Sequence, residues 1–88
     1  MITEHIRVYG RVQGVGFRNA TAKLASKFKV TGTVQNVDDF VEVFISGEYD
    51  EVKAFSDKVI KGPAPFSKVI SYEIKEISFR DFKQFKQI

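Results

Sequence analysis

The sequence predicts an α+β fold, a ferredoxin-like α/β sandwich in which an antiparallel sheet carries two helices on one face. Four runs alternate hydrophobic with polar residues, as strands with one buried face do. Two further runs place hydrophobic residues three and four positions apart, as amphipathic helices do. In chain order these runs read βαββαβ, with a tail that adds a short C-terminal strand. This order is typical of the ferredoxin-like sandwich.

The first strand and the first helix are joined by a glycine-containing loop. The strand is expected over residues 6–12, and the helix from Asn19, a candidate N-cap, to about Phe28. A helix with one apolar stripe packs one face against a sheet. The stripe here comprises Phe17, Ala20 or Thr21, Leu24, Ala25 and Phe28.

The middle of the chain predicts a hairpin. Residues 30–37 form the expected second strand, Asp38-Asp39 the turn, and an alternating run that ends at Gly47 the third strand. The apolar residues 40–45 and the Phe-rich tail raise the alternative of an aggregation-prone sheet edge. We favour an ordinary covered core for these residues.

The second half of the chain predicts a helix followed by two strands. The helix is expected over residues 49–61, and Gly62-Pro63 ends it. The fourth strand is expected over residues 69–79, and residues 82–88 add a short fifth strand. Buried positions of the helix are Val52, Phe55, Val59 and Ile60, and one face of the fourth strand carries Ile70, Tyr72 and Ile74.

Composition narrows the class of protein. The 88 residues are expected to form one domain, residues 1–88, and a hydrophobic content of 43% suffices for one core. The absence of cysteine excludes disulfides and thiolate catalysis, and it suits a cytoplasmic protein. No run approaches the ~18 apolar residues of a membrane span, so no membrane partner is expected. The net charge of +3 is too mild to indicate nucleic acid.

The loop Gln13-Gly14-Val15-Gly16-Phe17-Arg18 has the composition of an anion site at a helix N-terminus. Free N–H groups and the helix macrodipole attract anions there, and a guanidinium adds a forked donor that suits phosphate. The alternative is a plain turn, in which the glycines only relieve the backbone and the arginine is solvated. The Gly-Lys-Ser/Thr of a P-loop and the third glycine of a dinucleotide fingerprint are both missing.

Asn36 stands near the end of the second strand, just before the turn. We expect the first and second strands to lie close together in the sheet, so that the glycine loop faces Asn36. An amide in that place can hold a water molecule through its carbonyl and its N–H groups. The alternative is a turn residue whose amide hydrogen-bonds nearby backbone.

Residues 8–18, Val-Tyr-Gly-Arg-Val-Gln-Gly-Val-Gly-Phe-Arg, resemble the signature of the acylphosphatase family, G-x-V-Q-G-V-x-F-R. Residues 31–36, Thr-Gly-Thr-Val-Gln-Asn, are similar to the family's G-x-V-x-N block. Comparable residues further along extend the match over nearly the whole chain.

The resemblance implies hydrolysis of acyl phosphates to a carboxylate and inorganic phosphate, with no metal, cofactor or phosphoenzyme. It implies catalytic roles for Arg18, which binds the phosphoryl group, and for Asn36, which positions the attacking water. The expected partners are a small acyl phosphate as substrate and inorganic phosphate as product and inhibitor, and the chain is expected to act as a monomer. The implied phosphate-binding residues are Gln13, Gly14, Val15, Gly16, Phe17 and Arg18.

The chemistry of the residues agrees with this activity independently. A carboxylate is a good leaving group, and a loose phosphoryl-transfer transition state mainly requires positioning and charge stabilisation. Amide groups and one arginine supply both. The single histidine, His5, is expected at the surface or at a sheet edge rather than as a catalytic base.

Two positions depart from the family pattern. Thr33 stands where family members usually carry an aromatic residue, and the Asp38-Asp39 turn is one residue shorter than usual and has no glycine. A tight turn without a residue at positive φ can shift Asn36 or change the strand register, which bears on catalytic efficiency more than on the activity itself.

Two other functions compete with hydrolysis. An RNA-binding module has the same order of elements, and Arg7, Tyr9, Arg11 and Phe44 would lie on the open sheet face; however, the aromatic RNA signature is missing. A non-catalytic module that binds phosphate or carbamoyl phosphate would keep the loop, as the acylphosphatase-like domains of carbamoyltransferases do. Since the chain ends at Ile88, we expect a free-standing enzyme instead.

Overall fold

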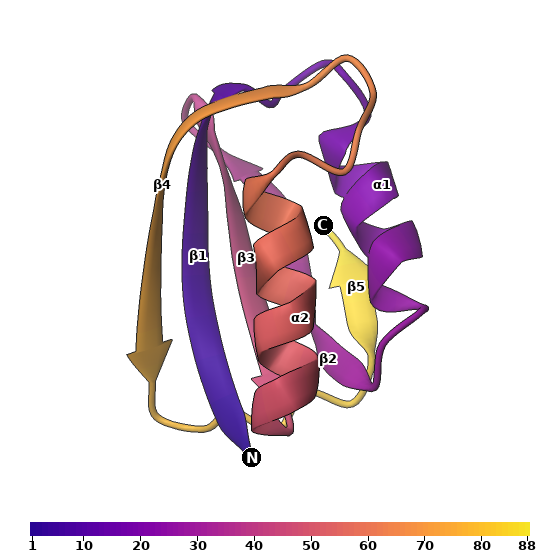
Figure 1. Cartoon of the computed structure of the whole chain (residues 1–88), viewed down its shortest axis with the longest axis vertical. Coiled ribbons are helices and arrows are strands. Elements are labelled where there is room, and N and C mark those ends of the chain that lie inside the picture. The colour runs from indigo at the N-terminus through magenta and orange to yellow at the C-terminus, as the bar shows by residue number, and fades with distance from the viewer.

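The computed structural model describes residues 1–88 as a five-stranded sheet with two helices packed on one face (Figure 1). This arrangement confirms the predicted ferredoxin-like α+β class. The strands are β1 (Ile2–Arg11), β2 (Val30–Val37), β3 (Phe40–Gly47), β4 (Lys68–Ile77) and β5 (Phe85–Gln87). The helices are α1 (Phe17–Ala25) and α2 (Tyr49–Ile60), and neither has the length and hydrophobicity that crossing a membrane requires.

The strand order is β4-β1-β3-β2-β5. One expectation about the sheet is wrong: the sheet is mixed and not antiparallel throughout, because β5 runs parallel to β2 while the other pairs are antiparallel. The first and second strands lie one strand apart, with β3 between them.

Strand β1 begins four residues earlier than its hydrophobic pattern predicts, because polar residues occupy its first buried positions. Thr3 and Glu4 are fully buried, and Thr3 shares a hydrogen bond of 2.6 Å with the hydroxyl of Ser46. The carboxylate of Glu4 accepts a hydrogen bond of 2.6 Å from Ser56 Oγ and pairs with Lys53. A buried carboxylate is tolerated when it is paired and hydrogen-bonded in this way.

Helix α1 is shifted relative to the prediction. It is capped by Gly16, which has φ 77°, so Asn19 lies inside the first turn and is not the cap. The helix ends at Ala25. In the turn that follows, Lys27 and Phe28 donate backbone hydrogen bonds to Leu24 and Ala25, three residues earlier, which is the tighter 3₁₀ pattern. Phe28 therefore lies beyond the helix, although it still packs against the core.

Helix α2 agrees with the prediction except for its last residue. Lys61 is the C-cap, and Gly62 follows in the left-handed conformation with φ 85°. Val52, Phe55 and Val59 are fully buried, whereas Ile60 packs at the margin. The core between helices and sheet comprises Ile6, Val8, Val12, Phe17, Ala25, Val34, Val41, Val43, Ile45, Val52, Phe55 and Val59.

Strand β4 is an edge strand that neither helix covers (Figure 1). It spans residues 68–77 rather than the expected 69–79. Tyr72 and Ile74 pair with buried Val8 and Ile6 of β1, so they lie on the helix side of the sheet. They nevertheless remain 50% and 37% exposed, and Ile70 is 74% exposed.

Candidate active site

The loop between β1 and α1 is shaped by two glycines in the left-handed conformation. Gly14 has φ 73° and Gly16 has φ 77°, which side-chain-bearing residues rarely adopt. A Cβ atom added at either position would meet nothing within 4 Å. Glycine is therefore needed for the backbone conformation, and the surface beside both residues is open.

The start of α1 leaves several backbone donors without acceptors. The first backbone bond of the helix runs from Ala20 N–H to Gly16 O, at 3.0 Å, and the preceding N–H groups of residues 17–19 have no backbone acceptor. No side chain caps the helix, and its first turn holds no acidic residue. This N-terminus can therefore accept an anionic group.

A small pocket of about 110 Å³ opens at this helix start. Such a volume is well below the roughly 300 Å³ of a drug-sized ligand site, so it suits one compact group. Arg18 is the single charged side chain in the lining. The pocket is lined by Val12, Gly14, Gly16, Phe17, Arg18, Asn19, Asn36 and Gln87.

Arg18 is held by the C-terminal segment. Its Nη1 donates a hydrogen bond of 2.7 Å to the main-chain oxygen of Ile88. The segment is fixed in turn, because β5 pairs with β2 and the N–H of Ile88 donates to Val34 O at 2.8 Å. The guanidinium is thus oriented beside the pocket while its remaining N–H groups stay available for a ligand.

Gln13 joins the glycine loop to the β2–β3 turn. Its Nε2 donates to the carbonyl oxygens of Asp38 and Phe40, at 3.0 and 2.9 Å. Because β1 and β2 are not adjacent, these bonds are a direct link between the loop and the hairpin that carries Asn36. The side chain of Gln13 therefore acts within the protein and does not line the pocket.

Asn36 lies on β2, opposite Val41 of β3 and one residue before the strand ends. It is exposed, it lines the pocket, and its side chain makes no hydrogen bond within the protein. The alternative of a turn residue is not supported, since the amide makes no hydrogen bond to nearby backbone. Its carbonyl oxygen and amide N–H groups are available to a ligand or to water.

Comparison with known proteins agrees with this geometry. The sequence matches the family model described as Acylphosphatase over residues 4–87. The chain belongs to the acylphosphatase family. It is 45% identical to an acylphosphatase of Staphylococcus haemolyticus, over 100% of both chains.

Solved structures give the same result for the fold. The acylphosphatase from Bacillus subtilis has a TM-score of 0.92 and 39% sequence identity, and the alignment covers 100% of this chain and 98% of that one. Full-length HypF in its phosphate- and nucleotide-bound form also has a TM-score of 0.92, with 28% identity. That alignment covers 99% of this chain and 12% of HypF.

The short turn of this family member does not disturb Asn36. Asp38 adopts φ 50°, the left-handed conformation that Asp and Asn tolerate better than most residues. The β2–β3 register stays regular over all eight pairs, from Val37–Phe40 to Val30–Gly47. The register does not shift, since the aspartate supplies the positive φ in place of glycine.

The pocket unites most of the residues that the sequence singled out. Gly14, Gly16, Phe17, Arg18 and Asn36 line it, whereas Gln13 and Val15 do not, and Val15 packs against the core. Sequence reasoning missed three contributors, Asn19, Gln87 and the oxygen of Ile88. Gly16 could have indicated the position of Asn19, because a helix whose N-cap is Gly16 has Asn19 in its first turn.

The titratable groups of the open sheet face lie away from the pocket. His5 is neither an edge residue nor fully exposed, because it lies inside β1, hydrogen-bonds Glu42 at 2.8 Å and stacks on Phe44 at 4.4 Å. Burial raises the pKa of Glu42, but hydrogen bonds from His5 and Gln35 outweigh it and leave that pKa below its usual value. No group of three His, Asp or Glu side chains could hold a metal ion.

Proposed function

We propose that this protein is an acylphosphatase that hydrolyses the carboxyl–phosphate anhydride bond of acyl phosphates. The observation that carries the proposal is the joint presence, in one pocket, of unpartnered N–H groups at a helix start, a fixed arginine and an unpartnered amide. These groups match the needs of phosphoryl transfer, which are positioning and charge stabilisation.

The phosphoryl group would bind at the N-terminus of α1. Backbone N–H groups of the loop and of residues 17–19 would donate to its oxygens, and Arg18 would add charge-assisted hydrogen bonds. These donors are preorganised by the glycine conformations and by the bond from Arg18 to Ile88. They therefore act on the charge that spreads over the phosphoryl oxygens in the transition state.

Asn36 would position the water that attacks phosphorus. The new bond forms between the water oxygen and phosphorus while the bond from phosphorus to the acyl oxygen breaks, which releases a carboxylate. A carboxylate needs no general acid to leave, and no carboxylic acid or histidine lines the pocket. We propose that the attacking water transfers its proton to an oxygen of the phosphoryl group itself. A pH–rate profile without an essential enzyme group near neutrality would support that assignment.

The core and the composition support further parts of the proposal, which concern domain organisation, location and inhibition. The buried hydrophobic residues form one cluster, which supports a single domain over residues 1–88, and we propose that it acts as a monomer. The cysteine-free composition supports a cytoplasmic location. Inorganic phosphate, the product, would inhibit by occupying the phosphoryl site, and no nucleic acid or membrane partner is proposed.

The direct test is hydrolysis of benzoyl phosphate in the presence of a metal chelator, with a phosphate monoester as control substrate. We expect turnover of the acyl phosphate that the chelator does not affect, and little turnover of the monoester, whose leaving group needs protonation. Loss of activity with the chelator, or equal activity on both substrates, would contradict the proposal.

The second candidate is a phosphate-binding module without hydrolysis. This candidate is supported by the similarity to part of HypF, whose structure was solved in a phosphate- and nucleotide-bound form. Calorimetric binding of phosphate at the pocket, combined with no turnover of benzoyl or carbamoyl phosphate, would select it over the enzyme.

A further inference from the structure

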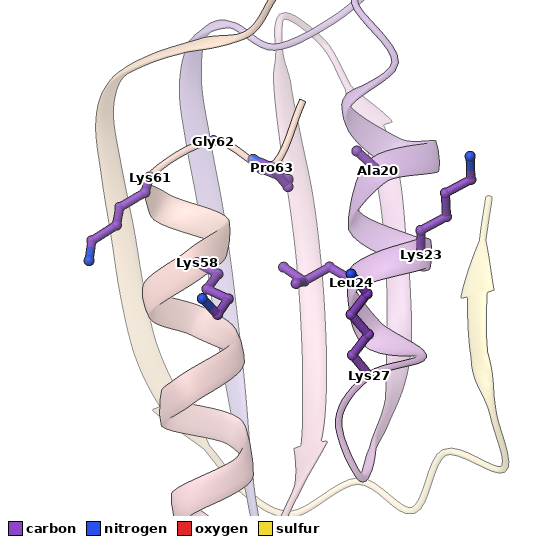
Figure 2. A pocket seen from close by; sticks show the side chains of 8 residues that line it. All are labelled: Ala20, Lys23, Leu24, Lys27, Lys58, Lys61, Gly62 and Pro63. Carbon is purple, nitrogen blue, oxygen red and sulfur yellow. The ribbon is translucent and has the colours of Figure 1, made fainter. Parts of the chain in front are cut away.

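A second hollow lies between the two helices, apart from the phosphate pocket. It is a groove of about 440 Å³, a volume typical of small-molecule sites, and it shares no lining residue with the pocket. Four of its eight lining residues are lysines and none is acidic. The groove is lined by Ala20, Lys23, Leu24, Lys27, Lys58, Lys61, Gly62 and Pro63 (Figure 2).

The positive charge of this groove is not neutralised within the protein. The four ion pairs of the structure involve Lys53, Lys83, His5 and Arg7, and none involves a groove lysine. No hydrogen bond uses the ammonium group of a groove lysine either. The C-terminal ends of α1 and α2 attract cations, but a helix end carries only about half an elementary charge. Each wall contributes two lysines, so most of their charge stays uncompensated.

The groove combines an apolar floor with charged rims. Figure 2 shows Leu24 reaching from α1 toward α2 with Lys27 beside it, while Lys23 and Lys61 extend away on the outer sides. Lysine carries its charge on a flexible four-carbon stem, so the outer pair can turn toward a ligand that spans the groove.

We propose that this groove binds a linear polyphosphate chain. Several separate point charges on flexible stems suit a chain of phosphates, whereas the forked guanidinium of Arg18 suits one fixed phosphoryl group. The lining has no aromatic side chain on which a nucleic-acid base could stack, and no side-chain amide or hydroxyl to recognise one. The ligand is therefore recognised by its charge and extended shape, and it binds independently of the proposed hydrolysis.

The test is a titration of the ¹⁵N-labelled protein with inorganic tripolyphosphate, with inorganic phosphate present throughout to occupy the phosphate pocket. We expect amide shifts at Leu24 and Gly62 and an affinity that falls as salt is raised. In the double variant Lys27→Gln/Lys58→Gln, the dissociation constant should rise at least about tenfold, since two charge-assisted contacts are lost.

The matched control removes the same charge elsewhere. Lys75 and Lys86 are exposed, and they lie outside the groove and outside every ion pair. They pair with His5 and Thr33, so they lie on the sheet face opposite the helices. Lys75→Gln/Lys86→Gln should leave the dissociation constant within about twofold, because exposed charges across the sheet are screened by solvent and salt. Benzoyl phosphate turnover should be unchanged in both double variants.

Three results would overturn the proposal. One is a set of amide shifts confined to Gly14 and Gly16, which would place tripolyphosphate in the phosphate pocket. Another is an equal loss of binding in both double variants, which would indicate attraction by net charge alone. The third is binding of single-stranded RNA or of anionic lipid vesicles at the groove amides without binding of tripolyphosphate.

Discussion

Single hydrogen bonds set the geometry of the phosphate pocket. The bond from Arg18 to the oxygen of Ile88 fixes the guanidinium, and the two bonds from Gln13 fix the loop against the β2–β3 turn. Neither residue pairs with an acidic side chain. The pocket is therefore preorganised by main-chain oxygen acceptors.

We expect Arg18→Lys to fail almost as fully as Arg18→Ala. Lysine has the charge but lacks the planar fork that can bond Ile88 and a phosphoryl oxygen together. Losing one preorganised donor costs about 3–4 kcal/mol, or roughly 10²–10³-fold in rate. The measurement is kcat/KM for benzoyl phosphate; a lysine variant within tenfold of the native enzyme would contradict the role given to the fork.

The predictability of the pocket differs from residue to residue. Gly14, Gly16 and Arg18 are recognisable from sequence because their conformational and charge properties are unusual at a strand–helix junction. Gln87 and Ile88 carry no such signal, because their contribution depends on where a three-residue parallel strand docks. The role of the Gln13 side chain was also hidden, since its acceptors are main-chain atoms about 25 residues away.

The hydrophobic pattern predicts the bounds of some strands correctly and those of others incorrectly. Strand β2 begins and ends where its alternation predicts, at residues 30 and 37. Strand β1 does not, because Thr3 and Glu4 are polar residues in buried positions whose partners, Ser46 and Ser56, lie on other elements. Tertiary hydrogen bonds of this kind cannot be read from a local pattern.

Among the residues of helix α2, Phe55 is expected to contribute most to the stability of the fold. This side chain is fully buried, and its ring centroid lies 6.0 Å from both Phe28 and Phe85. It therefore links α2 to the segment after α1 and to β5. We expect Phe55→Ala to lower the free energy of unfolding by about 3–5 kcal/mol in urea denaturation.

The control for this helix is Phe66, which is 78% exposed. Phe66→Ala should change the free energy of unfolding by no more than about 0.5 kcal/mol. A loss below about 1 kcal/mol in Phe55→Ala would show that the three rings are not the link between these elements.

The cross-strand contacts of Glu42 predict a pH effect. The pKa of this carboxyl is lowered in the folded protein from its ordinary value of 4.5. A lowered folded-state pKa adds stability above the unfolded-state pKa, and this stability is lost as the pH falls through the folded-state value. In Glu42→Gln that contribution is absent.

The measurement is the free energy of unfolding of both proteins between pH 7 and pH 3. We expect the native protein to be more stable than Glu42→Gln at neutral pH, and the difference to shrink below about pH 4.5. A difference that grows on acidification would contradict the assignment of the lowered pKa to the bonds from His5 and Gln35.

One edge of the sheet, the outer side of strand β4, is long and is not paired with another strand. Residues 40–45, which raised the alternative of an aggregation-prone edge, belong to the central strand β3, and Val41, Val43 and Ile45 are fully buried. The covered core favoured for them is confirmed. The exposed edge is β4, on which Ile70, Tyr72 and Ile74 remain 74%, 50% and 37% exposed. The sequence could not distinguish the two strands, because position in a sheet depends on the order of all its strands.

We expect the β4 edge to limit the solubility of the protein. Ile70→Lys places a charge on the unpaired edge strand, which disfavours pairing with a second chain. Light scattering at high concentration should show slower association, with benzoyl phosphate turnover unchanged. Phe79→Lys, which adds the same charge outside the strands, should give a smaller effect; an equal effect would assign the change to net charge instead.

Arg18 and Asn36 have separate roles in the proposed reaction, and the steady-state kinetics of Asn36→Ala on benzoyl phosphate distinguish these roles. Because this amide orients water and the phosphoryl group is held by other groups, kcat should fall about 10²–10³-fold. The inhibition constant of inorganic phosphate should stay near its native value, whereas Arg18→Ala should raise it strongly. An Asn36→Ala enzyme that keeps the full kcat would show that this amide does not position the attacking water.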